Sequence, residues 1–502
     1  MYTNQHFLQP WLRPFLERLR TFLLERHVEA YLVGGYVRDC LLGRETNDVD
    51  LAVNAEAVGL TQEVANLFGG RFVLLDEANQ VARVVFPPAS AESHQRWYLD
   101  LSTLRGGIVG DLPQRDFTIN AMAVDLQEVL NEAEISIVDP FGGRADLESK
   151  IVRVVREEAF QEDPARLLRA VRFASELGFT IEEKTKSLII RFHPFIASVA
   201  SERVKDEFCR ILAAQKAAHS LRYLDESGLL GVIMPELTAA KGVEQPKEHF
   251  WDVFSHSLET VSAIESLLRV EGSSAKPWIK EEALAIVPWS LRLAQHFDEE
   301  IGGGQTRRTL LKLAALLHDI AKPQCKIAEE NGRIRFFGHA QEGAAIASQI
   351  LQRLRFSNRE IKMVQKTIEY HLRPGQLANQ GLPTRRAIYR YFRDTEEVGI
   401  DTLYLNLADH LAARGPQLDY ATWQEHVETT RYVLQKRLEE ANMMAPLKLI
   451  DGHDLINRFG LNPGPHIGEL LELAREAQAA GEIGTKEEAL AFVERQLTLT
   501  RR

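Results

Sequence analysis

The chain has 502 residues, which is too long for one ordinary hydrophobic core, and we expect roughly two to four structural units. Its hydrophobic fraction of 45% and charged fraction of 26% are those of globular proteins and exclude a disordered or fibrous class. A net charge of −11 argues against a protein that coats nucleic acid by bulk attraction, so any RNA binding must depend on local basic groups.

Membrane insertion and disulfide bonding are both disfavoured. No apolar run approaches the roughly 20 residues that cross a bilayer, and the N-terminus lacks the apolar core of a signal peptide. We therefore expect a cytoplasmic protein with no membrane partner. The three cysteines, Cys40, Cys209 and Cys325, have neither the paired spacing of a zinc site nor the density of a disulfide scaffold. We interpret them as reduced packing residues.

Strand-like runs separated by turn signals characterise residues 1–145. The expected strands cover residues 30–33, 49–53, 71–75, 82–86 and 97–101. From about Asp146 onward these signals fade, and segments of helical period begin at residues 164–177 and 200–214. The predicted fold class is α+β, with an α/β head followed by an almost wholly helical remainder.

The first strand runs into two glycines, Gly34 and Gly35, and then into a helix that contains Arg38. Such a turn lets backbone N–H groups approach a phosphate closely, and the start of a helix favours negative charge. A glycine pair also marks many ordinary tight turns. The significance of this turn therefore depends on the residues that follow it.

Asp48 and Asp50 lie two residues apart in the next strand, so their carboxylates share one face. Like charges at close range repel, and a divalent cation such as Mg²⁺ between them removes the repulsion. Two exposed aspartates at the start of a strand are the alternative. Asp100, in the strand at residues 97–101, is a third candidate ligand for a two-metal site that transfers phosphoryl groups.

Five motifs, in a fixed order, resemble the class II tRNA nucleotidyltransferase and bacterial poly(A) polymerase family. They are residues 34–39 with Asp48 and Asp50, residues 115–123, residues 139–143, residues 162–166 and residues 201–207. The resemblance implies a polymerase-β-like head, a hinge at residues 139–143 and a helical neck. It implies that Asp48, Asp50 and Asp100 are catalytic, with Mg²⁺ on the first two. The implied nucleotide-binding residues are Gly34, Gly35, Arg38, Arg115, Asp116, Asn120, Asp163, Arg166, Arg169 and Arg172.

The motif at residues 162–166 is the family's nucleotide-reading motif. Asp163 offers two acceptors and Arg166 a fork of donors, so the two can present a complementary edge to cytosine or adenine. An ordinary helix ion pair is the alternative. Arg169 and Arg172 extend the row at helical spacing and predict a positive stripe for phosphates, with a solvated charged face as the alternative for Arg172. Gln114 stands where the family often has a second arginine.

A second set of polar residues lies in the helical half. It consists of His256, His318, Asp319, His339, His371 and Asp409. Imidazoles mixed with carboxylates suit a transition metal such as Mn, Fe, Ni or Co. Any one of these histidines is more often a packed core residue than a ligand. Their order, with the run at residues 318–323, resembles the HD phosphohydrolase superfamily and implies hydrolysis of a phosphate ester by metal-activated water.

Turn-rich stretches at residues 238–247, 271–277 and 302–305 and near residues 445–446 punctuate the helical half. With the two resemblances they predict four domains. These are a head at residues 1–145, a neck at residues 146–237, an HD domain at residues 238–445 and a helical tail at residues 446–502. The tail resembles that of tRNA nucleotidyltransferases, which implies tRNA binding, although a structural helix-turn-helix explains its turn equally well.

The function implied is addition of C, A or both to the 3′ end of tRNA, with CTP or ATP as substrate and an accessory phosphohydrolase. A poly(A) polymerase is the alternative, and an acidic chain with an HD domain favours the tRNA enzyme. Nucleotide second-messenger synthetase/hydrolases place the two motif sets in a different arrangement. A non-catalytic RNA-binding scaffold is disfavoured because Asp48, Asp50, His318 and Asp319 are all present. The oligomeric state is left open.

Overall fold

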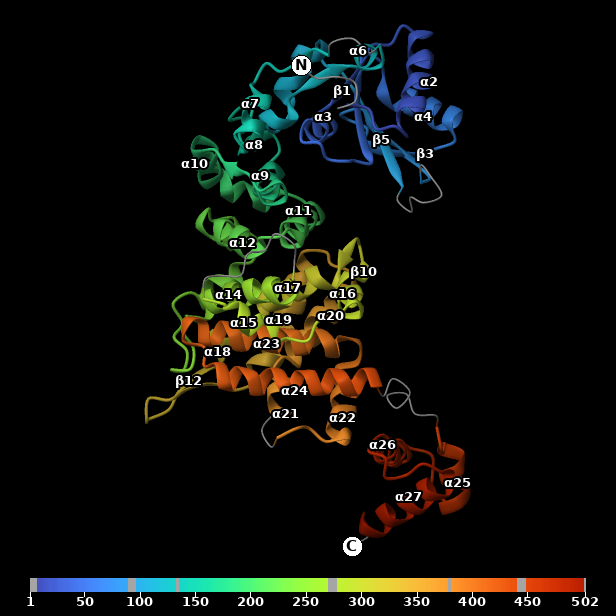
Figure 1. The fold of residues 1–502 in the computed structure, drawn as a ribbon, viewed down its shortest axis with the longest axis vertical. Coiled ribbons are helices and arrows are strands. Elements are labelled where there is room, and N and C mark those ends of the chain that lie inside the picture. Colours follow the sequence, from blue (N-terminus) through green and yellow to red (C-terminus); the bar gives the residue numbers. More distant parts are fainter. Residues whose placement is uncertain are drawn as a thin grey trace. The chain divides into compact units, whose positions relative to one another are not determined.

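The computed structural model describes residues 7–88, 96–131, 135–269, 278–377, 381–439 and 448–500. The chain forms two compact units, residues 1–200 with 226–232 and residues 201–225 with 233–502 (Figure 1). The predicted neck, residues 146–237, therefore contributes to both units. The predicted turns at residues 271–277 and 445–446 lie outside the described residues, and the four-domain division stays a prediction.

A mixed seven-stranded sheet forms the centre of the first unit, in the order β3-β4-β5-β2-β1-β6-β7. β2 and β5 pair in parallel, and the other neighbours pair antiparallel. The strands are β1 (Ala30–Val33), β2 (Asp48–Val53), β3 (Arg71–Asp76), β4 (Val81–Phe86), β5 (Trp97–Thr103), β6 (Ala123–Asp125) and β7 (Ile137–Val138). The five strands predicted from sequence are confirmed to within two residues at either end.

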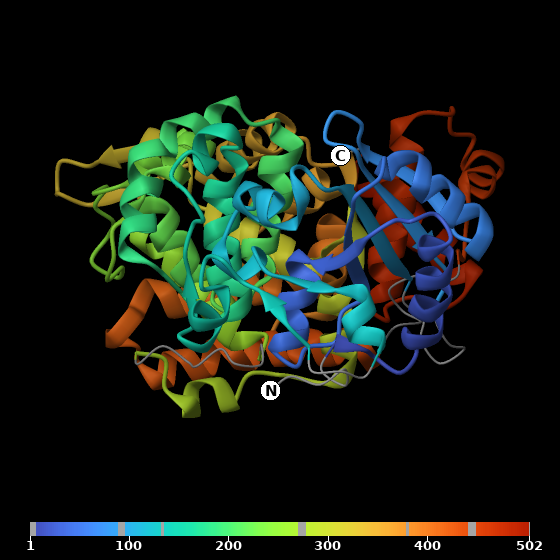
Figure 2. The ribbon, with the colours of Figure 1, turned by 90° about the horizontal axis from the view of Figure 1, so that it is seen from above.

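Two helices, α2 (Arg13–Leu24) and α4 (Ala57–Phe68), cover one face of this sheet, and Figure 2 shows both on the same side of the strands. The ring of Phe15 on α2 contacts the rings of Phe68 on α4 and Trp97 on β5. Trp97 and Leu99 are buried on this side. Because side chains alternate along a strand, Asp100 belongs to the opposite face, which α2 and α4 leave uncovered.

Short helices connect the strands and lead into the neck. They are α3 (Gly34–Leu41), α5 (Gly107–Asp111), α6 (Leu126–Leu130), α7 (Gly143–Glu148), α8 (Ala159–Glu162), α9 (Ala165–Leu177) and α10 (Glu183–Phe192). α9 begins directly after Pro164, a residue whose fixed φ suits the first turn of a helix. The helix predicted at residues 164–177 is thus confirmed, and it starts next to the predicted base-reading Asp163.

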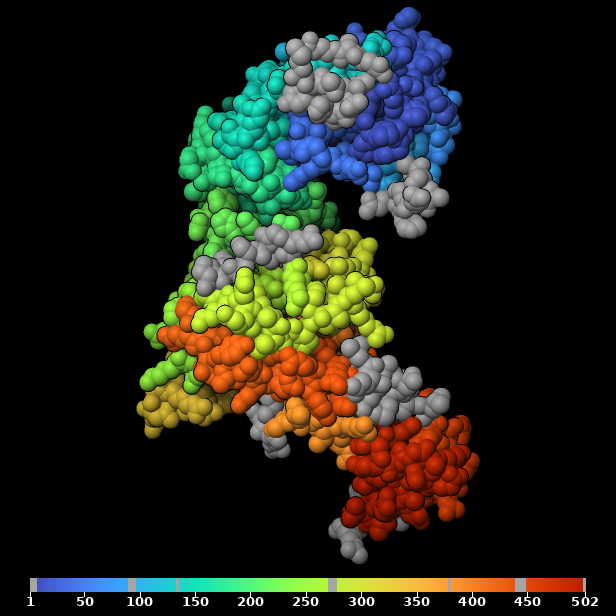
Figure 3. Space-filling model, viewed as in Figure 1, coloured from blue at the N-terminus to red at the C-terminus, as the bar shows by residue number. Residues whose placement is uncertain are grey.

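The rest of the chain is mainly helical. Its helices are α11 (Ser201–Ala213), α12 (Ala217–Glu226), α13 (Leu229–Ile233), α14 (Val253–Leu267), α15 (Glu281–Ala285), α16 (Leu291–Asp298), α17 (Arg307–Leu317), α18 (Lys322–Cys325), α19 (His339–Arg353), α20 (Asn358–Glu369), α21 (Arg373–Leu377), α22 (Arg385–Thr395), α23 (Gly399–Arg414), α24 (Tyr420–Glu439), α25 (Gly452–Phe459), α26 (Pro465–Ala479) and α27 (Lys486–Thr500). Figure 3 shows the side chains of α24, in orange, on the surface of the second unit. No helix in the described ranges has both the length and the apolar character needed to span a bilayer.

Three short strand pairs interrupt the part of the chain after residue 146 that was predicted to be almost wholly helical, and the sequence analysis did not predict them. They are β8 (Ile151–Val152) with β9 (Thr180–Ile181), β10 (Glu300–Gly302) with β11 (Gln305–Thr306), and β12 (Lys326–Ala328) with β13 (Ile334–Phe336). Strands of two or three residues are too short for alternation to be visible in a sequence. The predicted tail folds as three helices around its own apolar cluster, which includes Leu455, Leu470 and Val493.

A buried lysine joins α11 and α12 to the helices of the second unit. Lys312 on α17 is fully buried, and its Nζ donates to the carbonyl oxygens of Leu212 at 2.9 Å and Ala214 at 2.8 Å. The same Nζ lies 3.2 Å from Glu265 Oε1 on α14, which also accepts the N–H of Ala217 at 2.6 Å. These bonds satisfy backbone groups where α11 ends and α12 begins, groups that a helix cannot satisfy internally.

Replacing Lys312 by Met removes the positive charge beside the buried Glu265 and the donor to two carbonyl groups. We expect the free energy of unfolding of the second unit to fall by about 3–5 kcal/mol, measured by calorimetry or urea unfolding. Lys362→Met, which removes an exposed ion pair with Glu396, is the matched control and changes it by about 0.5 kcal/mol or less. Equal losses in the two variants would contradict the role assigned to Lys312.

Candidate functional site

The predicted glycine turn brings the start of α3 against an acid of β2. Gly34 has a φ of 65°, which favours glycine. A Cβ atom here would lie 3.3 Å from Asp50 Oδ2 and 3.5 Å from Arg115 Nη1. Because glycine leaves this space open, the N–H of Tyr36 reaches Asp50 Oδ2, with 3.3 Å between the heavy atoms. The two motifs that sequence placed in separate elements therefore meet.

The three predicted acids lie on adjacent parallel strands. Asp48 and Asp50 share a face of β2, and Asp50 pairs in register with Asp100 on β5. Burial and the nearby Asp100 raise the pKa of Asp50 to about 6, against the opposite effects of Arg115 and the Tyr36 N–H. The repulsion expected between Asp48 and Asp50 adds a smaller effect in the same direction, and a divalent cation at these two residues would relieve it.

Arg83 on β4 is a residue of this site that the sequence analysis missed. Its Nε lies 2.6 Å from Asp100 Oδ1 and its Nη2 lies 2.8 Å from Asp100 Oδ2, while Asp48 Oδ1 is 4.0 Å away. Arg83 and Asp100 stand opposite each other in the β4–β5 register. Both oxygens of Asp100 thus accept bonds from Arg83, so the pair that best fits a metal ion is Asp48 with Asp50.

Further predicted nucleotide-binding residues form a chain of contacts beside these acids. Arg38 Nη1 donates to Asn120 Oδ1 at 2.7 Å, and its other nitrogens bind Asp39. Asn120 Nδ2 in turn donates to Asp116 Oδ1 at 3.0 Å. Arg115 Nη2 lies 2.9 Å from Asp111 Oδ2. The structure therefore brings the motif at residues 34–39 and the motif at residues 115–123 together.

Asp116 links this chain of contacts to the neck. Its Oδ2 lies 3.2 Å from Arg169 Nη1 on α9. Burial acts to raise the pKa of Asp116, but Arg169, Asn120 and Arg166 outweigh it and hold the pKa below its usual value. A single charged carboxylate thus connects the head to the helix that carries the base-reading residues.

The two residues predicted to read the base lie at the start of α9. Arg166 Nη2 donates to the carbonyl oxygen of Gln114 at 2.9 Å, and its Nε lies 4.0 Å from Asp163 Oδ2. The Gln114 side chain, where the family often has a second arginine, accepts a bond from Arg156 Nη2 at 2.9 Å. An arginine from elsewhere in the sequence is therefore placed beside Gln114. Arg156 is a second residue that the sequence analysis missed.

Arg172 does not extend an exposed positive row along α9. Only 7% of its side chain is exposed, and its guanidinium lies over the ring of Phe173 and 3.1 Å from Glu176 Oε2. Helical spacing placed Arg172 on the same side as Arg169, but the later turns of α9 pack into the neck, where Val171 and Phe173 are buried. The predicted stripe is wrong at this position, as is the alternative of a solvated charged face.

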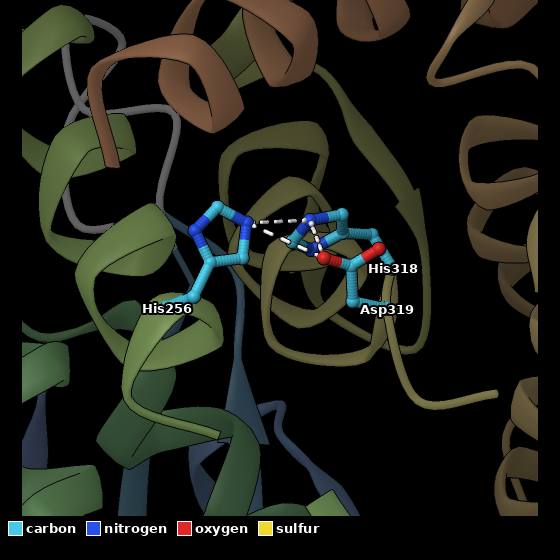
Figure 4. Close-up of side chains that lie close together, drawn as sticks. All are labelled: His256, His318 and Asp319. Carbon is cyan, nitrogen blue, oxygen red and sulfur yellow. Dashed lines mark hydrogen bonds and ion pairs between the residues drawn. The ribbon is translucent and has the colours of Figure 1, made fainter. Parts of the chain in front are cut away.

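The six residues of the HD pattern come from separate segments and meet in one cluster. His256 lies on α14, His318 and Asp319 follow α17, His339 begins α19, His371 follows α20 and Asp409 lies on α23. Figure 4 shows His256 facing His318 and Asp319. His256 Nε2 lies 3.0 Å from Asp409 Oδ1 and 3.4 Å from Asp319 Oδ2. On its other side, Asp319 Oδ1 lies 3.5 Å from His339 Nε2 and 4.0 Å from His371 Nε2.

Backbone carbonyl groups orient three of the imidazoles. The Nδ1 atoms of His318, His339 and His371 lie 2.9, 2.6 and 2.6 Å from the carbonyl oxygens of Ala315, Phe336 and Ile368, respectively. A donated Nδ1–H leaves the Nε2 lone pair facing the cluster, as in most metal-binding histidines. Among the described residues, none forms a well-aligned hydrogen bond with His339 Nε2 or Asp319 Oδ1. The donor set and these unsatisfied atoms fit a transition metal.

The charges of the cluster also suit a cation. Burial acts to lower the pKa of His318, but Asp319 and Asp409 outweigh it and raise the pKa to about 10. Lys322 Nζ, which the sequence analysis did not select, lies 2.6 Å from Asp319 Oδ2 and 2.6 Å from Gln245 Oε1. Its position three residues after Asp319 was the feature of the sequence that could have identified it, because residues at this spacing can form an ion pair. A metal ion can replace the extra proton on His318 as the partner of the two acids.

A cavity of about 420 Å³ lies beside the cluster. Four of the predicted ligands line it, together with cationic, uncharged polar and aromatic side chains. The lining includes Asp319, His339, His371, Asp409, Lys322, Arg335, Phe337, Leu372, Asn406, His410, Arg414 and His426. The volume falls in the range of small-molecule sites, so one nucleotide or a comparable phosphate ester fits beside the ligands.

Family models match most of the chain in four segments. A model described as the Poly A polymerase head domain matches residues 30–153, and one for an RNA- and SrmB-binding site of polymerase A matches residues 178–241. The HD domain model matches residues 253–414. A model for tRNA nucleotidyltransferase domain 2 matches residues 336–493.

Relatives match over nearly the whole length. An A-adding tRNA nucleotidyltransferase of Deinococcus radiodurans is 33% identical over 93% of this chain and 95% of its own. A CC-adding tRNA nucleotidyltransferase of Thermus thermophilus is 33% identical over 93% of each chain. The solved structure of the Thermotoga maritima CCA-adding enzyme complexed with tRNA is similar in fold, with a TM-score of 0.59 and 21% identity over 98% of this chain and 97% of that one.

Proposed function

This chain belongs to the tRNA nucleotidyltransferase family, and on that premise we propose that it adds nucleotides to the 3′ end of tRNA without a template strand, using CTP, ATP or both. The observation that carries the proposal is the contact between Asp50, which shares a strand face with Asp48, and the Gly34 turn on the side of the head sheet opposite α2 and α4. The relatives that match over the whole chain act on tRNA, which favours this function over poly(A) synthesis. The cytoplasmic location expected from sequence stays a prediction.

The choice of nucleotide is the first point to measure. Relatives of equal similarity add A in one case and CC in another. Purified protein is therefore incubated with tRNA lacking CCA, tRNA lacking only the final A, and an unrelated RNA. Each nucleoside triphosphate is supplied separately, and the 3′ ends are sequenced. Extension confined to the two tRNAs supports the proposal, whereas long A tracts on the unrelated RNA would indicate the poly(A) polymerase.

The reaction joins the 3′ oxygen of the tRNA to the α-phosphorus of the triphosphate and releases pyrophosphate. Mg²⁺ held by Asp48 and Asp50 would supply positive charge where the reacting oxygens become more negative. The start of α3 and Arg115 lie next to Asp50 and can bind triphosphate oxygens. Arg83, held by Asp100, adds a cation beside the same acids. We propose that Asp100 acts through Arg83 in this way.

Base selection is assigned to Asp163 and Arg166. The guanidinium of Arg166 is held by the Gln114 carbonyl group, which limits its movement, and Asp163 lies at the helix start beside it. A fixed fork of donors next to a carboxylate can pair with the Watson–Crick edge of cytosine or adenine. The protein then performs the selection that a template strand performs in other polymerases.

The HD cluster supports a second, hydrolytic activity. The ligands gather around Asp319: His256 and His318 lie near one of its oxygens, and His339 and His371 near the other. Asp409 contacts His256 and His318. We propose that the cluster holds a divalent transition metal, which is Mn, Fe, Ni or Co. Bound there, the metal would lower the pKa of a water molecule that attacks a phosphate ester. Lys322 holds Asp319 in place within the cluster. Terminal or cyclic phosphates on RNA ends or nucleotides are the proposed substrates.

Replacing Asp50 by Asn removes one negative charge from the proposed Mg²⁺ pair without changing its size. We expect nucleotide addition to be abolished while the fold and the hydrolytic activity stay unchanged. The assay is primer extension on tRNA lacking CCA, with circular dichroism as the check on folding. Asp76→Asn, a change at the far strand of the same sheet, serves as control and retains activity. Substantial extension by the Asp50→Asn protein would remove the metal assignment.

Replacing Arg166 by Ala removes the fork of donors but leaves Asp48 and Asp50 in place. Selection should weaken more than turnover, so the preference for C or A over U and G falls by roughly tenfold to a hundredfold. The measurement is kcat/KM for all four triphosphates on one tRNA primer. Arg191→Ala, an exposed arginine of the same unit, is the control. If all four values fall by one factor, Arg166 binds phosphate or supports α9 and does not read the base.

Replacing His318 and Asp319 together by Ala dismantles the HD cluster and leaves the first unit untouched. We expect metal-dependent hydrolysis of phosphate esters to disappear and tRNA extension to continue at the parent rate. The chain has another adjacent His–Asp pair, His453 and Asp454, and the same double change there leaves hydrolysis intact. Loss of both activities in a well-folded His318→Ala/Asp319→Ala protein would show that the two sites are not separate.

A further inference from the structure

The strand pair β12–β13 carries an exposed aromatic ring at the edge of the metal cavity. Phe337 follows β13 directly, and it is 62% exposed although it lines the cavity. An aromatic side chain normally buries most of its surface. Neither the ligand cluster nor the nucleotidyl-transfer site makes use of this ring. Its exposure beside a reactive centre therefore points to a ligand that covers it.

The strand pair β12–β13 is held next to the ligand cluster. His339 Nδ1 lies 2.6 Å from the carbonyl oxygen of Phe336, so the backbone next to Phe337 is bonded to a predicted ligand. β12 and β13 pair over three positions, which supports the segment on its other side. Because Phe337 lies two residues before His339, a group held against its ring lies within one nucleotide's length of the cluster.

Cations accompany the ring. The guanidinium of Arg335 lies 5.4 Å from the centre of the Phe337 ring and lines the same cavity. Arg335 Nε also lies 2.5 Å from Glu329 Oε1, which holds the side chain along the strand pair. Lys322 and Arg414 line the cavity as well, against one acidic lining residue outside the cluster, Glu248. This combination of an aromatic surface and positive charge is typical of sites that bind single-stranded nucleic acid.

We propose that Phe337 stacks on the nucleobase of the substrate and that Arg335 pairs with its phosphate, so that the hydrolytic site takes phosphate esters that carry a nucleobase. This assignment rests on the proposed phosphohydrolase function and adds the two residues that bind the nucleotide. The phosphate lies at the ligand cluster, and the base stacks on the exposed face of the Phe337 ring. Stacking of this kind tolerates any base, because every base has a π face.

The first test detects contact without requiring hydrolysis. A trinucleotide carrying 4-thiouridine and a 3′ phosphonate, which cannot be hydrolysed, is irradiated with the Mn²⁺-loaded full-length protein. We expect the cross-link to map to the peptide that contains Phe337 and to be lost in Phe337→Ala. Phe195→Ala, which removes an aromatic ring of similar exposure in the other unit, leaves it unchanged. Cross-links that map only to other segments overturn the proposal.

The second test measures kcat/KM for a trinucleotide 3′-phosphate, a mononucleotide 3′-phosphate and glycerol 2-phosphate. Phe337→Ala should lower the values for the two nucleobase-bearing substrates by about tenfold or more, mainly through KM. Glycerol 2-phosphate should change by less than twofold, and Phe337→Trp should restore the losses. The ratio of kcat/KM for the trinucleotide to that for the mononucleotide shows whether the preferred substrate is an RNA end or a free nucleotide.

Equal losses on all three substrates overturn the proposal, because Phe337 then acts by supporting His339. Unchanged values for the nucleobase-bearing substrates overturn it as well. If the parent protein hydrolyses none of the three with Mn²⁺, Ni²⁺ or Co²⁺, the proposed hydrolysis of terminal phosphates is wrong. The cross-linking result then decides separately whether the β12–β13 segment binds a nucleotide.

Discussion

Repulsion between neighbouring acids governs the arrangement of the head. The parallel register of β2 and β5 places Asp50 beside Asp100, and burial makes the negative charge of Asp50 harder to sustain. Arg83 offsets Asp100, while the start of α3 and Arg115 partly offset Asp50. The negative charge that is left at Asp48 and Asp50 suits a divalent cation. The HD cluster is built in a similar way. Lys322 forms an ion pair with Asp319, and the remaining ligands are mainly histidines.

Much of this arrangement could be predicted from sequence because it depends on local periodicity and on motif order. Alternation gave the strands and the shared face of Asp48 and Asp50, and the order of histidines and acids gave the six members of the HD cluster. The roles of Arg83 and Arg156 depend on which segments become neighbours, and a single sequence does not reveal strand pairing. Arg172 is a similar case. Helical spacing identifies the face of the helix on which it lies but does not reveal that this part of the helix is buried.

The acids of the head and the HD cluster lie in separate units, and the hydrogen bonds of Lys312 show that α11 belongs to the second unit. α11 carries the last of the five polymerase-family motifs, yet its end is bonded to α17 of the HD region. A resemblance read along the chain assigns it to the neck, whereas its hydrogen bonds assign it to the second unit. The boundaries suggested by the sequence motifs therefore differ from the boundaries of the packed units.

Asp116 has a consequence for engineering. One carboxylate holds Asn120 of the head and Arg169 of the neck, so the two segments have to be exchanged as a matched pair. A chimera that joins this head to the neck of a relative with another nucleotide preference needs an arginine at the position of Arg169. Without it, a buried negative charge would lose its main partner, and the graft would weaken the junction before its specificity could be assayed.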